Sequence, residues 1–366
     1  MADVYLQKLA RVLVHYSFKL KAGERFVIRA PEVAAPLVRA VYREALRAGA
    51  HVYPIIHLDG MREIFFQEAN DEQLSYTAPV EQFVTEHFDA GLTIWAEQNT
   101  RALTRIDPAR LALYKRAHAT QINRQMQREA EGAFRWCGTL FPTHAHAQDA
   151  GMSLADFEAF VYRAELLDEE DPLAAWQKVH DEQKKLVDFL MQHDEIHVVT
   201  PDTDVTYRTG GRKWINCDGR YSMPDGEVFS SPIENSVNGT VRFRYPANRD
   251  GNLVEDIRLT FRDGKVIESY ASRGLEYLNM MLDRDAGARY LGEVAFGTNY
   301  NIQEATGHTL FDEKIGGTMH MALGASIRLT GGMNESADHW DLVCDLHEGK
   351  VYADGKLCYE NGRFLI

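Results

Sequence analysis

Two short runs near the C-terminal end of the chain contain residue types that bind metal ions. The first run, Gly-Gly-Thr-Met-His-Met-Ala-Leu-Gly, contains His320, and the second, Ala-Asp-His-Trp-Asp, contains His339 and Asp341. Side chains two residues apart on a β-strand point to the same face, so His339 and Asp341 can act together. With His320 on a neighbouring strand, these three side chains predict a divalent metal site. The alternative is a pair of structural histidines beside a turn.

Two glutamates extend this candidate site. Glu227 ends the run Met-Pro-Asp-Gly-Glu and Glu293 ends Leu-Gly-Glu, and apolar residues typical of a strand follow both. A carboxylate buried in such surroundings is costly unless it is paired or bound to a metal ion. Taken singly, each glutamate also fits a solvated turn, so the prediction depends on their occurring together with the histidines.

Two further glutamates lie close in sequence to these segments. Glu234 follows Pro232-Ile233, and Glu313 ends the run Thr-Leu-Phe-Asp-Glu. Either is a candidate general base, or a partner that orients a metal ligand. A carboxylate in a surface turn explains each of them equally well.

The composition narrows the class of protein. The chain has 366 residues and a formal net charge of −14, unlike the basic proteins that bind nucleic acids. Its four cysteines form no Cys-x-x-Cys pair, so we expect neither a zinc knuckle nor a redox dithiol, and we predict a reducing, cytoplasmic setting. No apolar run reaches the roughly 20 residues of a membrane span, and no signal peptide is expected. We therefore expect a protein that binds neither nucleic acid nor membrane.

The N-terminal half shows alternating strand and helix patterns. No Gly-x-Gly-x-x-Gly follows any of its strands, so no dinucleotide site is expected. Alternation of this kind predicts an α/β domain with a mainly parallel sheet. The apolar spacing fits strands at 26–28, 51–56 and 90–95 and helices near 37–46, 63–68 and 108–117.

The C-terminal half has a different pattern. A long helix begins after Asp171 at Pro172, and turn pairs such as Asp263-Gly264 then separate short strand-like segments. One clear helix is expected near Leu275–Leu291. We place the domain boundary after the long helix, with an N-terminal α/β domain at 1–192. A mostly antiparallel β (α+β) domain at 193–366 would then carry the metal site. The predicted strands are 195–200, 204–208, 240–245, 257–261 and 266–270.

The chain resembles the thermophilic metallo-aminopeptidase family of the aminopeptidase T and aminopeptidase S type. The motifs that carry this resemblance are, in sequence order, the runs around Glu227, Glu293, Glu313, His320 and His339-Trp-Asp341. The resemblance covers most of the chain and is most specific in the C-terminal half. It implies a homodimer that acts on peptides and holds two divalent ions per chain, zinc, cobalt or manganese. The metal ligands that it implies are Glu227, Glu293, His320, His339 and Asp341.

In such a centre a metal-bridged hydroxide attacks the first peptide carbonyl and releases the N-terminal residue. The family pattern also has a catalytic tyrosine seven residues after the first histidine. That position is Ile327 here, and isoleucine cannot donate a hydrogen bond to an oxyanion. Ser326 and Arg328 are candidate replacement donors. We predict a metallo-aminopeptidase, a hydrolase, with this one departure from the family pattern.

Two other functions stay open at this point. His320, His339 and Asp341 alone form the two-histidine, one-carboxylate set that can hold a single ferrous ion in a ring-cleaving dioxygenase. Glu227 and Glu293 argue against this alternative, because a mononuclear site does not need them. The other possibility is a non-catalytic relative of the peptidases, which would bind metal without turnover.

Overall fold

The computed structural model describes residues 2–249 and 252–366, which form two compact units. The N-terminal unit contains the chain up to Ala175 together with Gly219–Pro224, and the C-terminal unit contains Trp176–Asp218 and Asp225–Ile366. Helix α9 (Pro172–Leu190) begins in the first unit and continues in the second. The domain boundary expected between residues 192 and 193 therefore stays a prediction.

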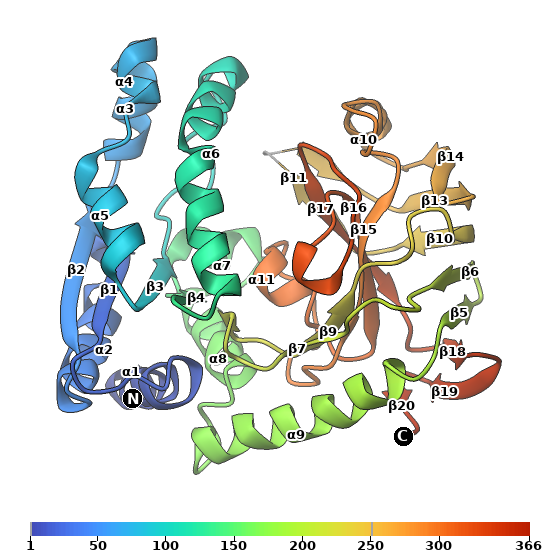
Figure 1. Ribbon diagram of the computed structural model, residues 1–366, viewed down its shortest axis with the longest axis horizontal. Helices are drawn as coiled ribbons and strands as arrows, with labels where there is room; N and C mark the ends of the chain where they lie inside the picture. Colours follow the sequence, from blue (N-terminus) through green and yellow to red (C-terminus); the bar gives the residue numbers. More distant parts are fainter. Residues whose placement is uncertain (1, 250–251) are drawn as a thin grey trace. The chain divides into compact units, whose positions relative to one another are not determined.

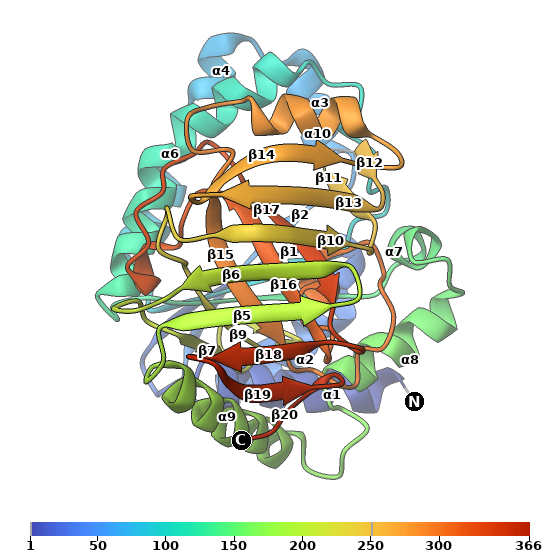
Figure 2. The same ribbon diagram turned by 90° about the vertical axis from the view of Figure 1, so that its right-hand side faces the viewer.

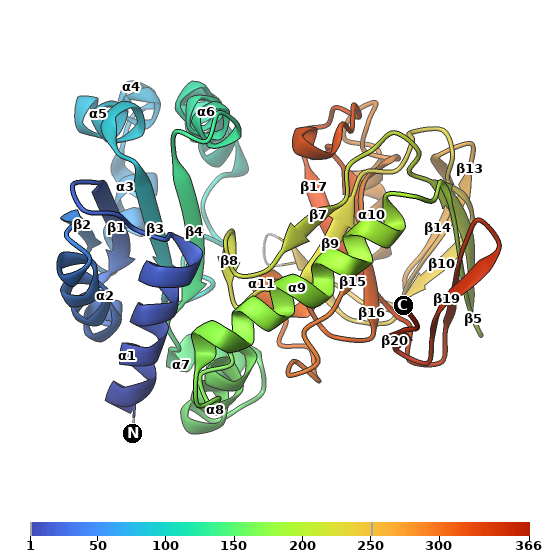
Figure 3. The same cartoon turned by 60° about the horizontal axis from the view of Figure 1, so that its bottom comes forward.

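A parallel sheet forms the centre of the N-terminal unit (Figures 1 and 3). Its strands lie in the order β2-β1-β3-β4-β8, and every neighbouring pair runs parallel, as the alternating pattern predicts. The predicted strand at 90–95 is confirmed in full. The strands of this sheet are β1 (Arg25–Pro31), β2 (His51–His57), β3 (Ala90–Trp95), β4 (Arg135–Leu140) and β8 (Ser222–Met223).

Helices connect these strands. Helix α2 buries Leu37, Val41 and Ala45 at helical spacing, and Gly49 follows its end with a positive φ of 85°. The predicted helix at 108–117 is the beginning of a longer helix, α6, which continues to Ala130. The helices of this unit are α1 (Ala2–Val12), η1 (Leu13–Ser17), η2 (Glu32–Ala34), α2 (Ala35–Arg47), α3 (Met61–Glu68), α4 (Asp71–Ser75), α5 (Pro79–His87), α6 (Pro108–Ala130), α7 (His144–Asp149) and α8 (Leu154–Ala164).

An eight-stranded antiparallel sheet, sheet B, forms one layer of the C-terminal unit (Figure 2). Its β13–β14 hairpin turns at Asp263-Gly264, where both residues have positive φ, 48° and 83°. The strand order is β14-β13-β10-β6-β5-β18-β19-β20. The bounds are β5 (Glu195–Thr200), β6 (Thr203–Arg208), β10 (Asn238–Phe243), β13 (Ile257–Arg262), β14 (Lys265–Tyr270), β18 (Lys350–Ala353), β19 (Lys356–Glu360) and β20 (Arg363–Phe364).

A five-stranded antiparallel sheet, sheet C, forms the second layer, and its strands cross behind sheet B at a steep angle in Figure 2. Its strand order is β17-β16-β15-β9-β7. The bounds are β7 (Ile215–Cys217), β9 (Glu227–Ser230), β15 (Leu291–Gly297), β16 (Thr318–Gly324) and β17 (His339–Asp345). The smaller elements of the unit are β11 (Ala247–Arg249), β12 (Asn252–Val254), α10 (Leu275–Leu282), α11 (Thr309–Asp312) and η3 (Arg328–Thr330).

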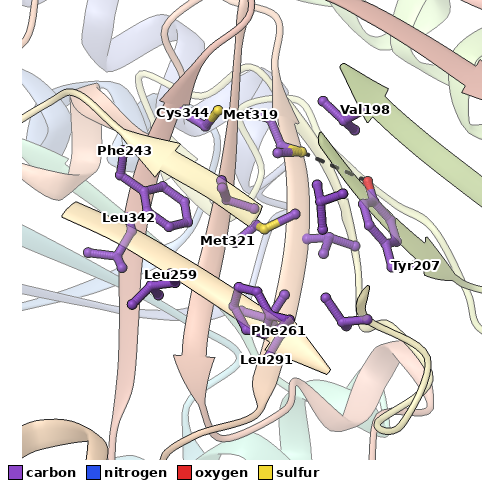
Figure 4. Close-up of a cluster of buried hydrophobic side chains, with 14 of the residues drawn as sticks. Val198, Tyr207, Phe243, Leu259, Phe261, Leu291, Met319, Met321, Leu342 and Cys344 are labelled. Atoms are coloured by element: carbon purple, nitrogen blue, oxygen red, sulfur yellow. Dashed lines mark hydrogen bonds between the residues drawn. The ribbon is translucent and has the colours of Figure 1, made fainter. Parts of the chain in front are cut away.

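The main core of the C-terminal unit lies between sheets B and C (Figure 4). Met319 and Met321 of β16 are fully buried in it, together with Leu342 of β17 and Phe243 of β10. Because side chains alternate along a strand, the residues between these point to the opposite face of sheet C. That second face contains His320.

One predicted element was wrong in length. Helix α10 ends at Leu282 rather than 291, and Leu291 already belongs to β15. Asp285, in the turn between them, accepts hydrogen bonds from the Gly287 and Ala337 amides and so stabilises a non-helical path. Among residues 2–249 and 252–366, no helix combines the length and the apolar character that crossing a bilayer requires.

Candidate metal centre

The strand register brings the predicted ligands of β16 and β17 to one face of sheet C. Residues that lie opposite each other in an antiparallel ladder point to the same face. Asp341 pairs with Ala322 and His339 pairs with Gly324. These partners lie two and four residues beyond His320 on β16, so all three predicted ligands share its face.

The pairing of β15 with β16 and with β9 places Glu293 and Glu227 on the same face of sheet C. Glu293 of β15 pairs with Ala322 and therefore lies on the His320 face. Glu227, at the beginning of β9, pairs with Gly297, which is four residues from Glu293 on β15. Four adjacent strands thus place all five predicted ligands on one face, whereas the sequence predicted only that His339 and Asp341 would share one.

The five side chains and Glu313 form two groups of potential ligands. In the first, atoms of Glu293, His339 and Asp341 lie within 4.8 Å of one another, with His339 Nε2 2.9 Å from Glu293 Oε2 and 3.3 Å from Asp341 Oδ1. In the second, atoms of Glu227, Glu313 and His320 lie within the same distance. His320 Nε2 is 3.6 Å from Glu293 Oε1, so Glu293 faces both groups with its two oxygens.

Main-chain carbonyls fix the orientation of both imidazoles. His320 Nδ1 is 2.9 Å from the carbonyl oxygen of Glu313, and His339 Nδ1 is 2.7 Å from that of Ala325. A carbonyl only accepts, so Nδ1 carries the proton in each ring. In the neutral imidazole, Nε2 is then the unprotonated nitrogen, and it faces the carboxylates. This arrangement is typical of metal-ligating histidines.

At this site, two buried carboxylate oxygens have no hydrogen-bond donor among the described residues, Glu227 Oε2 and Asp341 Oδ1. Leaving a buried acceptor unpaired costs about 1–3 kcal/mol, and more for a charged group. A divalent cation satisfies such oxygens, and a set of carboxylates and imidazoles suits zinc, cobalt or manganese. The residues therefore fit the divalent ions that we expect from the sequence.

The charges of the site shift its protonation equilibria strongly. Burial alone would lower the pKa of His320, but the hydrogen bond with Glu293 and the charges of Glu227 and Glu293 raise it to about 9. Burial raises the pKa of Glu227 to about 8, although Lys314 opposes this shift. Burial also opposes ionisation of Asp341, but the neighbouring His339 holds the pKa of that carboxyl well below its usual range. Such opposed shifts in one cluster are typical of functional sites.

Sequence reasoning missed two charged residues of the site. Lys314 is 1% exposed, and its Nζ lies 3.4 Å from Glu227 Oε1 and 3.9 Å from Asp225 Oδ1. The same nitrogen also contacts Glu313 Oε1. The two missed residues are Lys314 and Asp225. Their only signals in the sequence were that Lys314 follows Glu313 and that Asp225 lies two residues before Glu227.

A small cavity lies beside the ligands. Its volume is about 80 Å³, and Asp341 and Glu313 form part of its lining. Trp340, Val343 and Tyr245 contribute apolar surface to the same cavity. Glu313, a predicted general-base candidate, is thus placed both next to the ligands and at a space where a substrate group can lie.

Glu234, the other general-base candidate, and Arg328, a candidate replacement donor, form ion pairs outside the two ligand groups. Glu234 forms an ion pair with Arg212, with an Nη2–Oε2 distance of 2.6 Å, and accepts a hydrogen bond from the Met333 amide. Arg328 pairs with Glu335 at 2.6 Å, and both side chains are largely exposed. These contacts hold the segment that connects β16 to β17, and they do not join the two ligand groups.

Ser326 and Ile327 lie in the same connecting segment. The Ser326 hydroxyl accepts a hydrogen bond from the Asn334 amide at 3.2 Å. Ile327 is half-buried and packs against a small apolar cluster that contains Cys217, Phe229 and Ala295. Phe229 and Ala295 pair across β9 and β15 on the ligand-bearing face, so the Ile327 side chain contacts the same face as the predicted ligands.

Comparisons with known proteins agree over nearly the whole chain. A family model described as thermophilic metalloprotease (M29) matches residues 2–364. The chain is 32% identical to aminopeptidase 2 of Geobacillus stearothermophilus, over 96% of this chain and 95% of that one. It is 28% identical to aminopeptidase T of Thermus aquaticus, with 96% and 94% covered. The structure of wild-type AmpT from Thermus thermophilus matches 100% of both chains with a TM-score of 0.87 at 26% identity. The chain therefore belongs to the thermophilic metalloprotease (M29) family.

Proposed function

We propose that this metalloprotease is an aminopeptidase that releases N-terminal residues from peptides with two divalent metal ions. The curated relatives named above are aminopeptidases and match nearly the whole chain. The observation that carries the two-ion proposal is the pair of adjacent ligand groups on one face of sheet C, which meet at Glu293.

Charge balance favours two ions over one. The two ligand groups and the groups around Lys314 contain five carboxylates, those of Asp225, Glu227, Glu293, Glu313 and Asp341, and one ammonium, that of Lys314. When all are ionised and the histidines are neutral, four negative charges remain. Two divalent ions compensate them fully, whereas one ferrous ion would leave two buried charges uncompensated. Membership of the metalloprotease family likewise does not favour the dioxygenase alternative.

Each ligand has a distinct place in this proposal. Glu293, His339 and Asp341 would hold one ion, and Glu227 and His320 would hold the other. The two oxygens of Glu293 face His320 and His339. When bound, the ions supply a Lewis acid for the scissile carbonyl and bring the pKa of a water molecule near neutrality.

The remaining groups act on protons and on the substrate. Glu313 would accept a proton in this proposal, which its position among the predicted ligands and in the cavity lining supports. The free α-amine of a peptide can meet the acidic lining formed by Asp341, Glu313 and Asp312. The apolar lining at Trp340 and Val343 can then receive part of the first side chain.

A comparison of free and blocked peptides tests this function. The metal-loaded chain should hydrolyse dipeptides and aminoacyl amides and should leave their N-acetylated forms intact, because the blocked amine cannot meet the carboxylates. A chelator or Glu293→Ala should abolish this turnover. Hydrolysis of the acetylated peptides, or turnover that persists after either change, would contradict the proposal. No turnover on any peptide would favour a non-catalytic relative.

We also propose a homodimeric, cytoplasmic protein. The four cysteines are free and buried, which fits a reducing compartment. The homodimer follows from the family resemblance, and light scattering coupled to size-exclusion chromatography tests it. A single species at the mass of one 366-residue chain would contradict it.

A further inference from the structure

Lys314 is a buried cation that faces carboxylates rather than carbonyls. Among the lysines and arginines that the structure describes, Arg128 is the other buried side chain, and it donates to the main-chain oxygens of Thr85, Phe88 and Ala133. Lys314 Nζ instead lies within ion-pair distance of Asp225, Glu227 and Glu313. Its positive charge is therefore part of the electrostatics of the ligand cluster.

The two oxygens of Glu227 have different partners. Oε1 contacts Lys314 Nζ at 3.4 Å. Oε2 has no hydrogen-bond donor among the described residues and lies 3.5 Å from His320 Nε2. The Glu227 carboxylate thus contacts the ammonium with one oxygen and faces an imidazole with the other. The ammonium therefore competes for this carboxylate with any metal ion that Glu227 binds.

The first ligand group, Glu293, His339 and Asp341, lacks such a competitor. Within the part of the chain that the structure describes, the ion-pair contacts of Glu293 and Asp341 are with His320 and His339, and no lysine or arginine lies within 4.0 Å. An ion bound by Glu293, His339 and Asp341 would therefore not share its carboxylates with a fixed cation. The two groups are similar in ligand type, but a fixed ammonium contacts the carboxylates of only the second group.

We propose that Lys314 is a tethered counter-ion that makes the two metal sites unequal in affinity, a proposal that rests on the two-ion centre proposed above. The ion at Glu293, His339 and Asp341 binds tightly. The ion at Glu227 and His320 binds more weakly, because the ammonium occupies Glu227 Oε1 and repels a divalent cation in a buried site where charges are poorly screened. Asp225 holds the ammonium in this position.

The inequality has a functional consequence. At low concentrations of free metal the chain would hold one ion, and the second site would fill only as the concentration rises. Because the proposed hydrolysis uses both ions, the supply of metal would control activity through the weaker site. Lys314 is a positioning residue in this scheme, since it acts through Glu227.

Titration of the metal-free, full-length chain with Co²⁺, followed by calorimetry and by the visible absorption of the bound ion, tests the proposal. The unaltered chain should bind two ions with dissociation constants that differ by at least about tenfold. Lys314→Met should tighten the weaker site by at least about tenfold. Asp225→Asn should weaken that site further, because the ammonium then interacts more strongly with Glu227 and Glu313.

A control variant and a double variant separate the effect of Lys314 from a general effect of losing a lysine or of misfolding. Lys350→Met removes an exposed lysine that pairs with Glu360 at 3.0 Å, and it should leave both dissociation constants unchanged. If Lys314→Met does not fold because Asp225 loses its ammonium contact, the double variant Lys314→Met/Asp225→Asn preserves the net charge and should still bind the second ion more tightly than the unaltered chain.

Three results overturn the inequality. These are equal affinities in the unaltered chain, an unchanged or weaker second site in Lys314→Met, and an equal shift in Lys350→Met. If two ions bind with equal affinity and peptides are hydrolysed, only the role of Lys314 fails. If the unaltered chain binds no ion at all, the proposed function fails together with it.

Discussion

His320 Nδ1 lies 2.9 Å from the main-chain oxygen of Glu313, so a residue of the cavity lining also orients a predicted metal ligand with its carbonyl. This contact fixes the proton on Nδ1 and leaves Nε2 to face Glu227 and Glu293. Glu313, which directly follows α11, is therefore part of the candidate metal centre although it lies outside sheet C.

Removal of His320 should empty one metal site. We expect His320→Ala to retain one ion per chain and to hydrolyse peptides at least about a hundredfold more slowly. Loss of a residue that only orients a metal ligand already lowers metal affinity or activity by about 10–100-fold. Elemental analysis and turnover measure the two effects. His197→Ala is the matched control, because His197 is on sheet B and pairs with Asp204 at 2.8 Å. Two tightly held ions in His320→Ala would rule out its assignment as a ligand.

Metal binding should release protons. The pKa of His320 is about 9 in the protein without metal, so its ring is protonated at neutral pH and must lose a proton before Nε2 can bind an ion. Metal affinity should therefore rise with pH up to about 9, by about tenfold per unit for each proton released. Calorimetry in buffers of different ionisation enthalpy counts these protons. An affinity that does not change from about pH 6 to pH 9 would contradict this linkage.

A tyrosine at position 327 should improve catalysis. Ile327 contacts the ligand-bearing face but has no hydrogen-bond donor, and losing an oxyanion donor costs about 10²–10³ in rate in other enzymes. We expect Ile327→Tyr to raise kcat by at least about tenfold on a dipeptide substrate. Ile327→Phe adds the ring without the hydroxyl and should give no increase. Equal rates for the two variants would show that the hydroxyl is not what the site lacks.

A core substitution next to His320 should affect stability rather than metal binding. Met321 is fully buried between sheets B and C (Figure 4), on the face opposite the ligands. Met321→Ala should lower the free energy of unfolding by about 2–5 kcal/mol, through lost burial and a cavity. The number of ions bound below the melting temperature should not change. Denaturant unfolding with parallel metal analysis checks both points, and a loss of metal at unchanged stability would contradict the alternation of faces on β16.

The sequence predicted those features that depend on local patterns. The His-x-Asp spacing placed two predicted ligands, His339 and Asp341, on one face of β17. The Asp263-Gly264 pair predicted a hairpin, and its positive φ angles confirm the turn chemistry. Such features can be predicted from the sequence because the residues that determine them lie within a few positions of one another.

Features that depend on distant pairing could not be predicted. An Asp-Glu-Lys run is typical of an exposed surface, and Lys314 is buried only because the segment after α11 lies against Glu227, 87 residues away in the chain. The register between β9 and β15, which brings Glu227 to the ligand face, likewise has no local signal. The contacts of Glu234 with Arg212 and of Arg328 with Glu335 were equally unreadable from spacing.

The number of divalent ions that peptide hydrolysis requires tests the central claim most directly. Metal-free chain should be titrated with zinc, cobalt or manganese while bound metal and turnover of a dipeptide are measured in the same samples. We predict two ions per chain at saturation, with activity appearing as the second ion binds. Full activity with a single ion per chain, or activity in the chain from which metal has been removed, would contradict the two-ion centre.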